Sequence, residues 1–335
     1  MIQADSGMPR LTHIALVFFV AAATARAQNS PRFVDAGKEL VITYGPVSLP
    51  ARTTHDEMKE LPTLTVMLPA DGWIRGMDVD LIDSHGRKLP QHLLHHLSAM
   101  APDERDLFNP VMMRFGAAGA ETGSIDLPRF IGIRVHKGDS LFVSIMLHND
   151  TDTAYDDVVV RARAPFTHAD ALLPALTVYP MGMVIGPKDK PNVFDLPPGR
   201  SEQYWEGSPA VAVRLLGVMG HLHQYGVLLR LEDRTAKTVL LEERPKTDSA
   251  GNILSMPLSS FLWTFGKPIY PSHVYRLTAV YENPTGRTIP DGGMGVLGGI
   301  VMLSSGTWPR VDRNNAEYKK DVEAILHSDH QMAMP

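Results

Sequence analysis

The chain has 335 residues, of which 44% are hydrophobic and 21% are charged, and its formal net charge at pH 7 is −5. This composition is typical of a globular protein long enough for two ordinary domains, and it argues against a disordered chain. No run of Lys and Arg with interleaved aromatic residues occurs, so nucleic acid is not an expected partner. Because the chain has no cysteine, disulfides, thiolate metal sites, iron–sulfur clusters and cysteine nucleophiles are excluded. His, Met and carboxylate chemistry remain.

The first 27 residues have the pattern of a secretory signal peptide. Arg10 supplies the positive start, residues 11–23 the apolar stretch, and Ala-Arg-Ala at 25–27 the cleavage motif. The apolar stretch is shorter than the roughly 20 residues that a membrane span needs. We therefore expect cleavage after Ala27, a periplasmic or secreted protein, and no membrane span after cleavage. An uncleaved anchor is the alternative that the sequence leaves open.

Strand patterns dominate the N-terminal half. Residues 39–44, 64–68, 77–82 and 157–163 favour strands, and two further strands at 131–135 and 141–148 flank the turn 136–140, which predicts a β-hairpin. Alternation in the second of these places positions 143, 145 and 147 on one face and His148 on the other, more polar face. Residues 164–180, with three prolines and little periodicity, are expected to connect two domains at 36–165 and 178–310.

The C-terminal half begins a second series of strands near Met181. Strands are expected at 210–216, 219–232, 238–242, 274–281 and 294–303, separated by Gly- and Pro-rich turns. Long amphipathic helices are missing from both halves, which favours an all-β protein built as antiparallel sandwiches or jelly rolls. Two all-β halves of similar length suggest structural duplicates. Residues 311–335 are expected to form a short helix at 316–327 and a flexible tail.

His221 and His223 are the strongest candidates for metal ligands. Side chains at i and i+2 of a strand share a face about 7 Å apart, so both rings can lean onto one ion. Zinc would accept this pair as readily as copper, but Met294, inside a small-residue apolar run, would favour a soft ion such as Cu(I). The alternative is ordinary hydrogen-bonded histidines and a core methionine, in a chain with 14 His and 17 Met.

His95, His96 and His148 form a second possible ligand set, made of imidazoles only. In a strand, the adjacent His95 and His96 would face opposite ways, whereas a helix would put His92 with them on one side. Pro90 and Pro102 leave room for only a short element, so we expect an irregular strand end where a β-bulge turns both rings inward. His92 is expected at the surface or behind the ligands. Two sites of unlike softness suggest redox work.

In order and spacing these six residues resemble the copper type II, ascorbate-dependent monooxygenases, the family of peptidylglycine α-hydroxylating and dopamine β-monooxygenases. The resemblance covers roughly Glu39 to Ser305. An adjacent His-His pair and a later His match the family's first copper site, and His-x-His with a later Met matches its second. The resemblance implies two tandem jelly-roll-like β-sandwich domains, two copper ions per chain, and ascorbate or another one-electron reductant. It implies that the Met-containing site activates O₂ beside the substrate while the all-His site stores and passes an electron.

The sequence departs from the family at the positions that hold a peptide. Met219 stands where peptide-amidating members carry an arginine that grips the substrate carboxylate, and Val296 and Gly298 replace their Asn and Tyr. Met146 replaces a Gln near the third His. We therefore expect an exported dicopper monooxygenase that hydroxylates an aliphatic C–H bond of a small, non-peptide substrate. The alternative is a copper-binding or copper-carrying protein without turnover, for which the tail residues His327, His330, Met332 and Met334 offer further ligands or chance occurrences.

Overall fold

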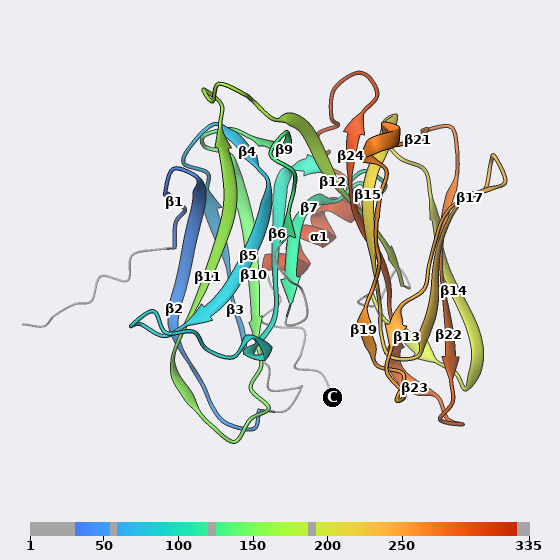
Figure 1. Ribbon diagram of the computed structural model, residues 1–335, viewed down its shortest axis with the longest axis horizontal. Coiled ribbons are helices and arrows are strands. Elements are labelled where there is room, and N and C mark those ends of the chain that lie inside the picture. Colours follow the sequence, from blue (N-terminus) through green and yellow to red (C-terminus); the bar gives the residue numbers. More distant parts are fainter. Residues whose placement is uncertain (1–30, 54–58, 120–124, 187–191, 327–335) are drawn as a thin grey trace, which may run out of the picture. The chain divides into compact units, whose positions relative to one another are not determined.

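The computed structural model describes residues 31–53, 59–119, 125–186 and 192–326, and the structural statements below concern these residues (Figure 1). The expected signal peptide and the His- and Met-containing tail lie outside them. Residues from Pro31 onward form one compact unit. Within the described ranges, no helix has both the length and the apolar character needed to cross a membrane. The fold class is all-β, as predicted.

The N-terminal half contains two sheets that appear as layers in Figure 1. One contains β1 (Val34–Asp35), β2 (Glu39–Leu49), β11 (Tyr155–His168), β5 (Gly76–Ile82) and β8 (Ile125–Asp126). The other has the order β3 (Lys59–Met67), β10 (Ser140–Leu147), β6 (Leu94–Arg105) and β7 (Met112–Gly119). A short 3₁₀ turn, η2 (Gln91–Leu93), precedes β6. Neighbouring strands in both sheets run antiparallel.

The C-terminal half repeats this two-sheet arrangement. β12 (Leu176–Ile185), β24 (Gly295–Leu303) and β15 (Val213–Leu222) form one sheet, with β20 (Leu258–Ser260) and β21 (Lys267–Ile269) on the far side of β15. The order β14 (Gly199–Gly207), β22 (Tyr275–Asn283), β16 (Gly226–Asp233) and β17 (Thr238–Glu243) makes the other. Two short ribbons pair β13 (Phe194–Leu196) with β23 (Ile289–Gly293), and β18 (Lys246–Thr247) with β19 (Ile253–Ser255).

Backbone hydrogen bonds join the two halves. β4 (Gly72–Ile74) pairs with the end of β11 and with β9 (Ile131–Val135), and β9 pairs in parallel with β12. The path β11-β4-β9-β12-β24 is therefore one continuous sheet, and a single cluster of buried aliphatic side chains contains residues from both halves.

The predicted alternation in β10 is confirmed, but the predicted hairpin is wrong. Val143, Ile145 and Leu147 are buried in the core, whereas Met146 and His148, the residue after the strand, are half-buried. The turn after β9 does form, because the Asp139 amide donates to the His136 carbonyl at 3.0 Å. However, β9 and β10 belong to different sheets and do not pair. Local sequence encodes a turn, whereas the partner of each strand depends on residues far away in the chain.

Three other expected boundaries also need correction. The segment 164–180 is not an irregular connection, because β11 continues to His168 and β12 begins at Leu176. Ala164 and Phe166 continue the alternating burial of β11, but alanine gives a weak hydrophobic signal. Pro102 does not end a short element. It lies inside the twelve-residue β6, where the register shifts between Ala101 and Arg105, because a bulge tolerates proline. Residues 219–232 form parts of β15 and β16, with a turn between them.

Two buried asparagines give the halves the same local hydrogen-bond pattern. The Asn149 side-chain amide donates to the carbonyls of Leu49, Pro50 and Thr153, and its oxygen accepts from Thr151. In the second half, Asn283 repeats these bonds with Leu196, Pro197, Arg287 and Thr285. Each asparagine thus ties a Leu-Pro corner to the turn that follows its own strand, a likeness that supports duplicated halves.

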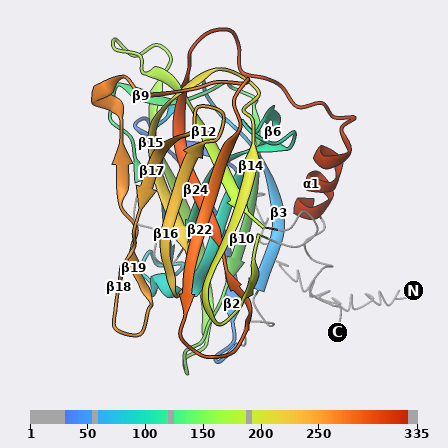
Figure 2. The ribbon, with the colours of Figure 1, turned by 90° about the vertical axis from the view of Figure 1, so that its right-hand side faces the viewer.

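The predicted C-terminal helix is confirmed as α1 (Ala316–Leu326). It lies beside β3 in Figure 2, and the Thr63 hydroxyl donates to the Ile325 carbonyl at 2.6 Å. Tyr318 packs against Met100 and Met112, and its hydroxyl donates to the Pro102 carbonyl at 3.1 Å. The helix therefore covers part of the second N-terminal sheet.

Candidate functional site

The register of β15 and β24 places the C-terminal ligand candidates side by side. Leu222 is paired with Gly295, the last pair of this ladder. His223 follows Leu222 at the end of β15, and Met294 precedes Gly295 at the start of β24. Because the two strands are antiparallel, the backbones of His223 and Met294 lie next to each other, just beyond the paired residues. His221 belongs to the preceding pair of the ladder, opposite Val296. The rings of His221 and His223 have centroids 5.4 Å apart and are perpendicular.

A buried tyrosine hydroxyl holds His223 and Met294 in this arrangement. The Tyr281 hydroxyl accepts hydrogen bonds from the His223 amide at 3.1 Å and from the Met294 amide at 3.0 Å, and it donates to the Met294 carbonyl. Tyr281 is fully buried, and burial raises the pKa of its phenol. The phenol therefore stays protonated and keeps its donor. Sequence reasoning missed this residue, because an alternating apolar strand gives no signal that separates it from a core tyrosine.

Beside His221, the outer face of the sheet lacks bulky side chains. Gly182, Gly298 and Met219 lie in one row across β12, β24 and β15, and Met219 is exposed. A Cβ atom on Gly182 would meet nothing within 4 Å, and one on Gly298 would meet only the Met219 carbonyl at 4.0 Å. Met219 and Gly298, two of the positions where the sequence departs from the peptide-amidating enzymes, thus lie with Gly182 in an open strip of uncharged residues, next to His221.

The N-terminal candidates lie at a β-bulge, as predicted, but His95 is exposed, so the expectation that both rings turn inward is not met. Met146 of β10 is opposite His96, but Leu147 is opposite Leu94, so His95 is the extra residue. The rings of His95 and His96 have centroids 5.2 Å apart and planes 60° apart. The Nδ1 atom of His96 is buried without a hydrogen-bond partner. Burial, with a smaller contribution from His95, lowers the pKa of His96 to about 4, so its imidazole is neutral at physiological pH and can act as a ligand.

His148 follows β10 directly, two residues after Met146, which is paired with His96. Its amide donates to the Leu93 carbonyl at 2.9 Å, and its Nε2 lies 3.1 Å from the Thr53 carbonyl. A carbonyl can only accept, so Nε2 carries the proton and Nδ1 keeps its lone pair. Metal-bound histidines commonly donate their second ring nitrogen in this way. His92 is exposed, with Nε2 4.0 Å from an Asp150 carboxylate oxygen.

The two candidate sets fit copper to different degrees. Within the described ranges, no three His, Asp or Glu side chains gather closely enough to hold a metal, so the all-His triad is not assembled at ligand distance. The unpartnered nitrogen of His96 and the oriented ring of His148 nevertheless match an imidazole site. In the second set, two adjacent imidazoles lie beside the fixed backbone of Met294, whose thioether is a ligand type that Cu(I) prefers.

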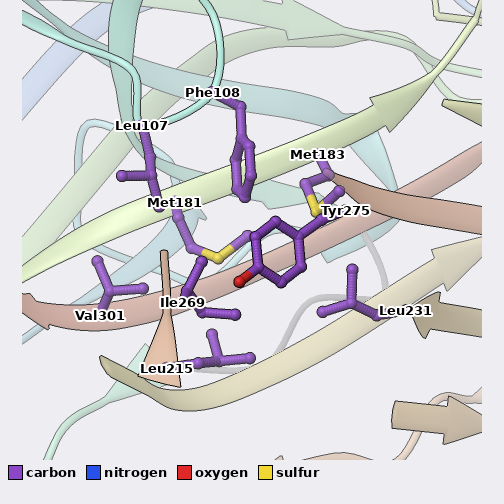
Figure 3. Close-up of a pocket in the computed structure, with 9 residues that line it drawn as sticks. All are labelled: Leu107, Phe108, Met181, Met183, Leu215, Leu231, Ile269, Tyr275 and Val301. Atoms are coloured by element: carbon purple, nitrogen blue, oxygen red, sulfur yellow. The ribbon is translucent and has the colours of Figure 1, made fainter. Parts of the chain in front are cut away.

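An apolar cavity lies elsewhere, between the C-terminal sheets and the segment that joins β6 to β7 (Figure 3). Met181, Met183 and Tyr275 line it together with Leu107, Phe108, Leu215, Leu231, Ile269 and Val301. The Tyr275 hydroxyl accepts from the Tyr270 amide at 2.9 Å, and burial raises its pKa to about 12. With no charged lining residue, the cavity is a packing gap in the core, and the two methionines are not candidate ligands.

No family model and no curated protein matches the chain. Among solved structures, the major capsid protein P2 of bacteriophage PM2 aligns at 11% identity and a TM-score of 0.35, covering 75% of this chain and 100% of that one. A protein provisionally described as secreted from Eubacterium rectale aligns at 8% identity and a TM-score of 0.20, covering 74% of each chain. A second such protein, from Parabacteroides distasonis, has 8% identity, a TM-score of 0.19, and coverage of 82% and 92%.

Proposed function

We propose that this protein is an exported dicopper monooxygenase that hydroxylates an aliphatic C–H bond of a small, non-peptide substrate. The observation that carries the proposal is the Tyr281 hydroxyl, which binds the backbone of His223 and of Met294 at once. A structural tyrosine in the core needs only one partner. Here all its bonds go to the two residues that, with His221, would hold a soft copper ion.

The N-terminal set would hold the other copper ion. His96 offers a neutral imidazole with a buried, unpartnered nitrogen, and His148 offers Nδ1 while Nε2 is engaged by Thr53. His95 lies at the bulge beside them. A shift of these rings toward one another would complete the triad, and the bulge leaves His95 outside the regular pairing of the ladder. Two copper ions, one per set, would supply the two electrons that reduction of O₂ to the hydroxylating level requires.

The substrate would lie on the open strip formed by Gly182, Gly298 and Met219. Because none of these three residues carries a charge, the strip favours a largely apolar molecule over a peptide carboxylate. Burial of apolar surface would orient the substrate and exclude water from the edge next to His221.

A copper carrier without turnover is the second candidate. It is favoured by the same strip, which offers no polar group to fix the position of a substrate, and by the separation of the all-His residues. Both candidates need the ligands, but only the enzyme needs the two sites to act together.

Oxygen consumption separates the two candidates. Copper-loaded parent, His148→Ala and His223→Ala proteins would be compared with ascorbate and a library of apolar metabolites, with formation of hydroxylated product as the readout. If the protein is an enzyme, the parent should form hydroxylated product as it consumes oxygen, and each variant should form product at least a hundredfold more slowly. His92→Ala, an exposed histidine outside both sets, is the matched control and should keep full activity. Equal turnover in either ligand variant would exclude a two-site mechanism, and copper binding without product would support the carrier.

A further inference from the structure

The turn that begins at His223 is bound to a second turn farther along the sequence. Its residues, 223–226, are closed by the Gly226 amide, which donates to the His223 carbonyl at 3.1 Å. The second turn, residues 248–252, joins β18 to β19 in the connection that crosses from β17 of one C-terminal sheet to β20 of the other (Figure 2). We call the first the ligand turn and the second the ribbon tip.

Three hydrogen bonds hold the ligand turn from two sides. The Tyr225 amide donates to the Gly251 carbonyl at 3.0 Å, and the Gln224 side-chain amide donates to the Ala250 carbonyl at 3.0 Å. On the other side, the Glu282 amide donates to the Tyr225 carbonyl at 3.0 Å. The backbone of Tyr225 is therefore fixed between the ribbon tip and β22.

The Asp248 carboxylate fixes the shape of the ribbon tip. It accepts from the amides of Ala250 and Asn252 at 2.9 Å each and from the Asn252 side chain at 2.8 Å. The bond from the Asn252 side chain, followed by those from the backbone, lowers the pKa of Asp248. The carboxylate thus stays charged at neutral pH and keeps these bonds, so the ribbon tip offers the ligand turn a defined surface.

Tyr225 has a backbone conformation that is unfavourable for its residue type. Its φ is 68°, in the left-handed region, and it occupies the third position of the ligand turn. Turns with a positive φ at this position take glycine or asparagine, because other side chains crowd the backbone there. Such residues persist only where their surroundings hold them, and they gather at functional sites. The strain at Tyr225 lies two residues after a proposed ligand.

The Tyr225 ring gives a reason to keep this strain. A Cβ atom on Gly251 would stand 2.7 Å from Cδ1 and 2.9 Å from Cε1 of the ring, which is closer than Cβ atoms come to their neighbours. The ring therefore lies directly on the backbone of Gly251, where only glycine leaves room for it. Glycine in place of Tyr225 would relieve the strain but would remove this contact between the two turns.

We propose that Tyr225 is a positioning residue of the His/His/Met set, which fixes His223 by packing its ring on Gly251 and so joining the ligand turn to the ribbon tip. The inference rests on the proposed copper function. Rotation of the ligand turn would move the His223 imidazole relative to His221 and Met294. A turn that is already fixed leaves less ordering to be done when the ion binds, which raises the affinity of the set.

Two substitutions at residue 225 test the role of the ring. They would be made in His96→Ala protein, in which only the His/His/Met set is expected to bind copper. Tyr225→Phe keeps the ring and should keep the Cu(I) affinity, measured by competition with a chromophoric chelator. Tyr225→Asn suits a positive φ but lacks the ring, and it should weaken Cu(I) binding by at least about tenfold. The hyperfine splitting of bound Cu(II) should change in Tyr225→Asn and stay as in the parent in Tyr225→Phe.

Two glycine substitutions separate positioning from stability. Gly251→Ala should also weaken Cu(I) binding by about tenfold, because the new Cβ atom would displace the Tyr225 ring. Gly86→Ala is the matched control, since Gly86 has the same φ of 80° but a Cβ atom there meets nothing within 4 Å. Both alanine variants should lower the midpoint of urea denaturation through backbone strain, but Gly86→Ala should leave the Cu(I) affinity unchanged.

The outcomes distinguish this inference from the proposed function. Full Cu(I) affinity in Tyr225→Asn, or equal losses of affinity in Gly251→Ala and Gly86→Ala, would overturn the positioning role and leave the copper proposal standing. Loss of affinity in Tyr225→Phe as large as that in Tyr225→Asn would also overturn it, because the ring alone would then not be sufficient. If the His96→Ala protein itself bound no copper, the proposed function would fail, and this inference with it.

Discussion

Tyr281 connects three backbone groups that come from different parts of the sequence, and its removal should affect both stability and metal binding. In Tyr281→Phe, the amides of His223 and Met294 and the Met294 carbonyl lose their partner. Leaving these part-buried groups without a partner should cost about 2–3 kcal/mol in the free energy of unfolding. Loss of this support should weaken Cu(I) binding at the His/His/Met set by about tenfold.

Tyr275→Phe is the matched control for this prediction. Tyr275 lies on the same strand, is equally buried, and accepts a hydrogen bond from the Tyr270 amide at 2.9 Å. It should lose stability without a change in Cu(I) affinity, measured by competition with a chromophoric chelator. Equal Cu(I) affinity in Tyr281→Phe and the parent would show that the hydroxyl supports the core and not the site.

Glu243 is a second buried polar residue, and its burial predicts that stability depends on pH. It is 2% exposed, and burial raises the pKa of its carboxyl above the ordinary 4.5, although the Ser259 hydroxyl and the Gly220 amide act in the opposite direction. A raised pKa in the folded state means that stability is highest when the carboxyl is protonated and falls as pH rises through that pKa. Glu243→Gln should therefore raise the midpoint of thermal unfolding near pH 7 and change it little near pH 4. A larger gain near pH 4 would contradict this.

The residue types of the candidate site could be predicted from the sequence, but their supports could not. Histidines and a methionine are informative because few side chains bind copper. The residues that orient them are ordinary core residues, such as Tyr281, or backbone carbonyls, such as that of Thr53 beside His148. Their contacts depend on the register between strands that are far apart in the sequence. Composition and periodicity do not predict that register.

The paired strands β15 and β24 form the face on which a substrate would lie. Gly298 has open space where a side chain would stand, and its neighbours in the row are Gly182 and Met219. Gly298→Leu should fold normally, because a Cβ atom here meets only the Met219 carbonyl at 4.0 Å and glycine is itself unfavourable inside a strand. It should leave copper content unchanged and reduce product formation at least tenfold by filling the strip. Unchanged turnover, measured with the substrate that the parent hydroxylates, would place the substrate elsewhere.

Strand positions were easier to predict than strand partners. The alternation of β10 and the bulge at His95 follow from local rules, since pleating and ring placement involve only neighbouring residues. The partners of β9 and β10 follow from which face each strand buries against residues far away in the chain. The hairpin prediction was wrong for that reason. His223 also lies one residue beyond β15, in the turn closed by the Gly226 amide on the His223 carbonyl at 3.1 Å, whereas the sequence indicated an unbroken strand.

For the molecule as a whole, the repeated asparagine pattern predicts equivalent effects in the two halves. Asn149 and Asn283 are 0% and 2% exposed, and each donates to three carbonyls. Asn149→Ala and Asn283→Ala should each lower the free energy of unfolding by about 2–4 kcal/mol, because buried carbonyls lose their donor. Asn252→Ala, which removes a bond in an exposed turn, should cost under about 1 kcal/mol. Urea denaturation measures all three, and unequal losses at the first two would argue against duplicated halves.

Copper stoichiometry shows whether both ligand sets bind metal. Metal-free protein would be reconstituted with copper at neutral pH, freed of excess metal, and measured by elemental analysis per chain. Two separate ligand sets predict two copper ions per chain, one after His96→Ala and one after His223→Ala. His92→Ala should retain two. A parent value near zero would contradict the copper proposal, and a value near one that survives either ligand substitution would show that the corresponding set is not a metal site.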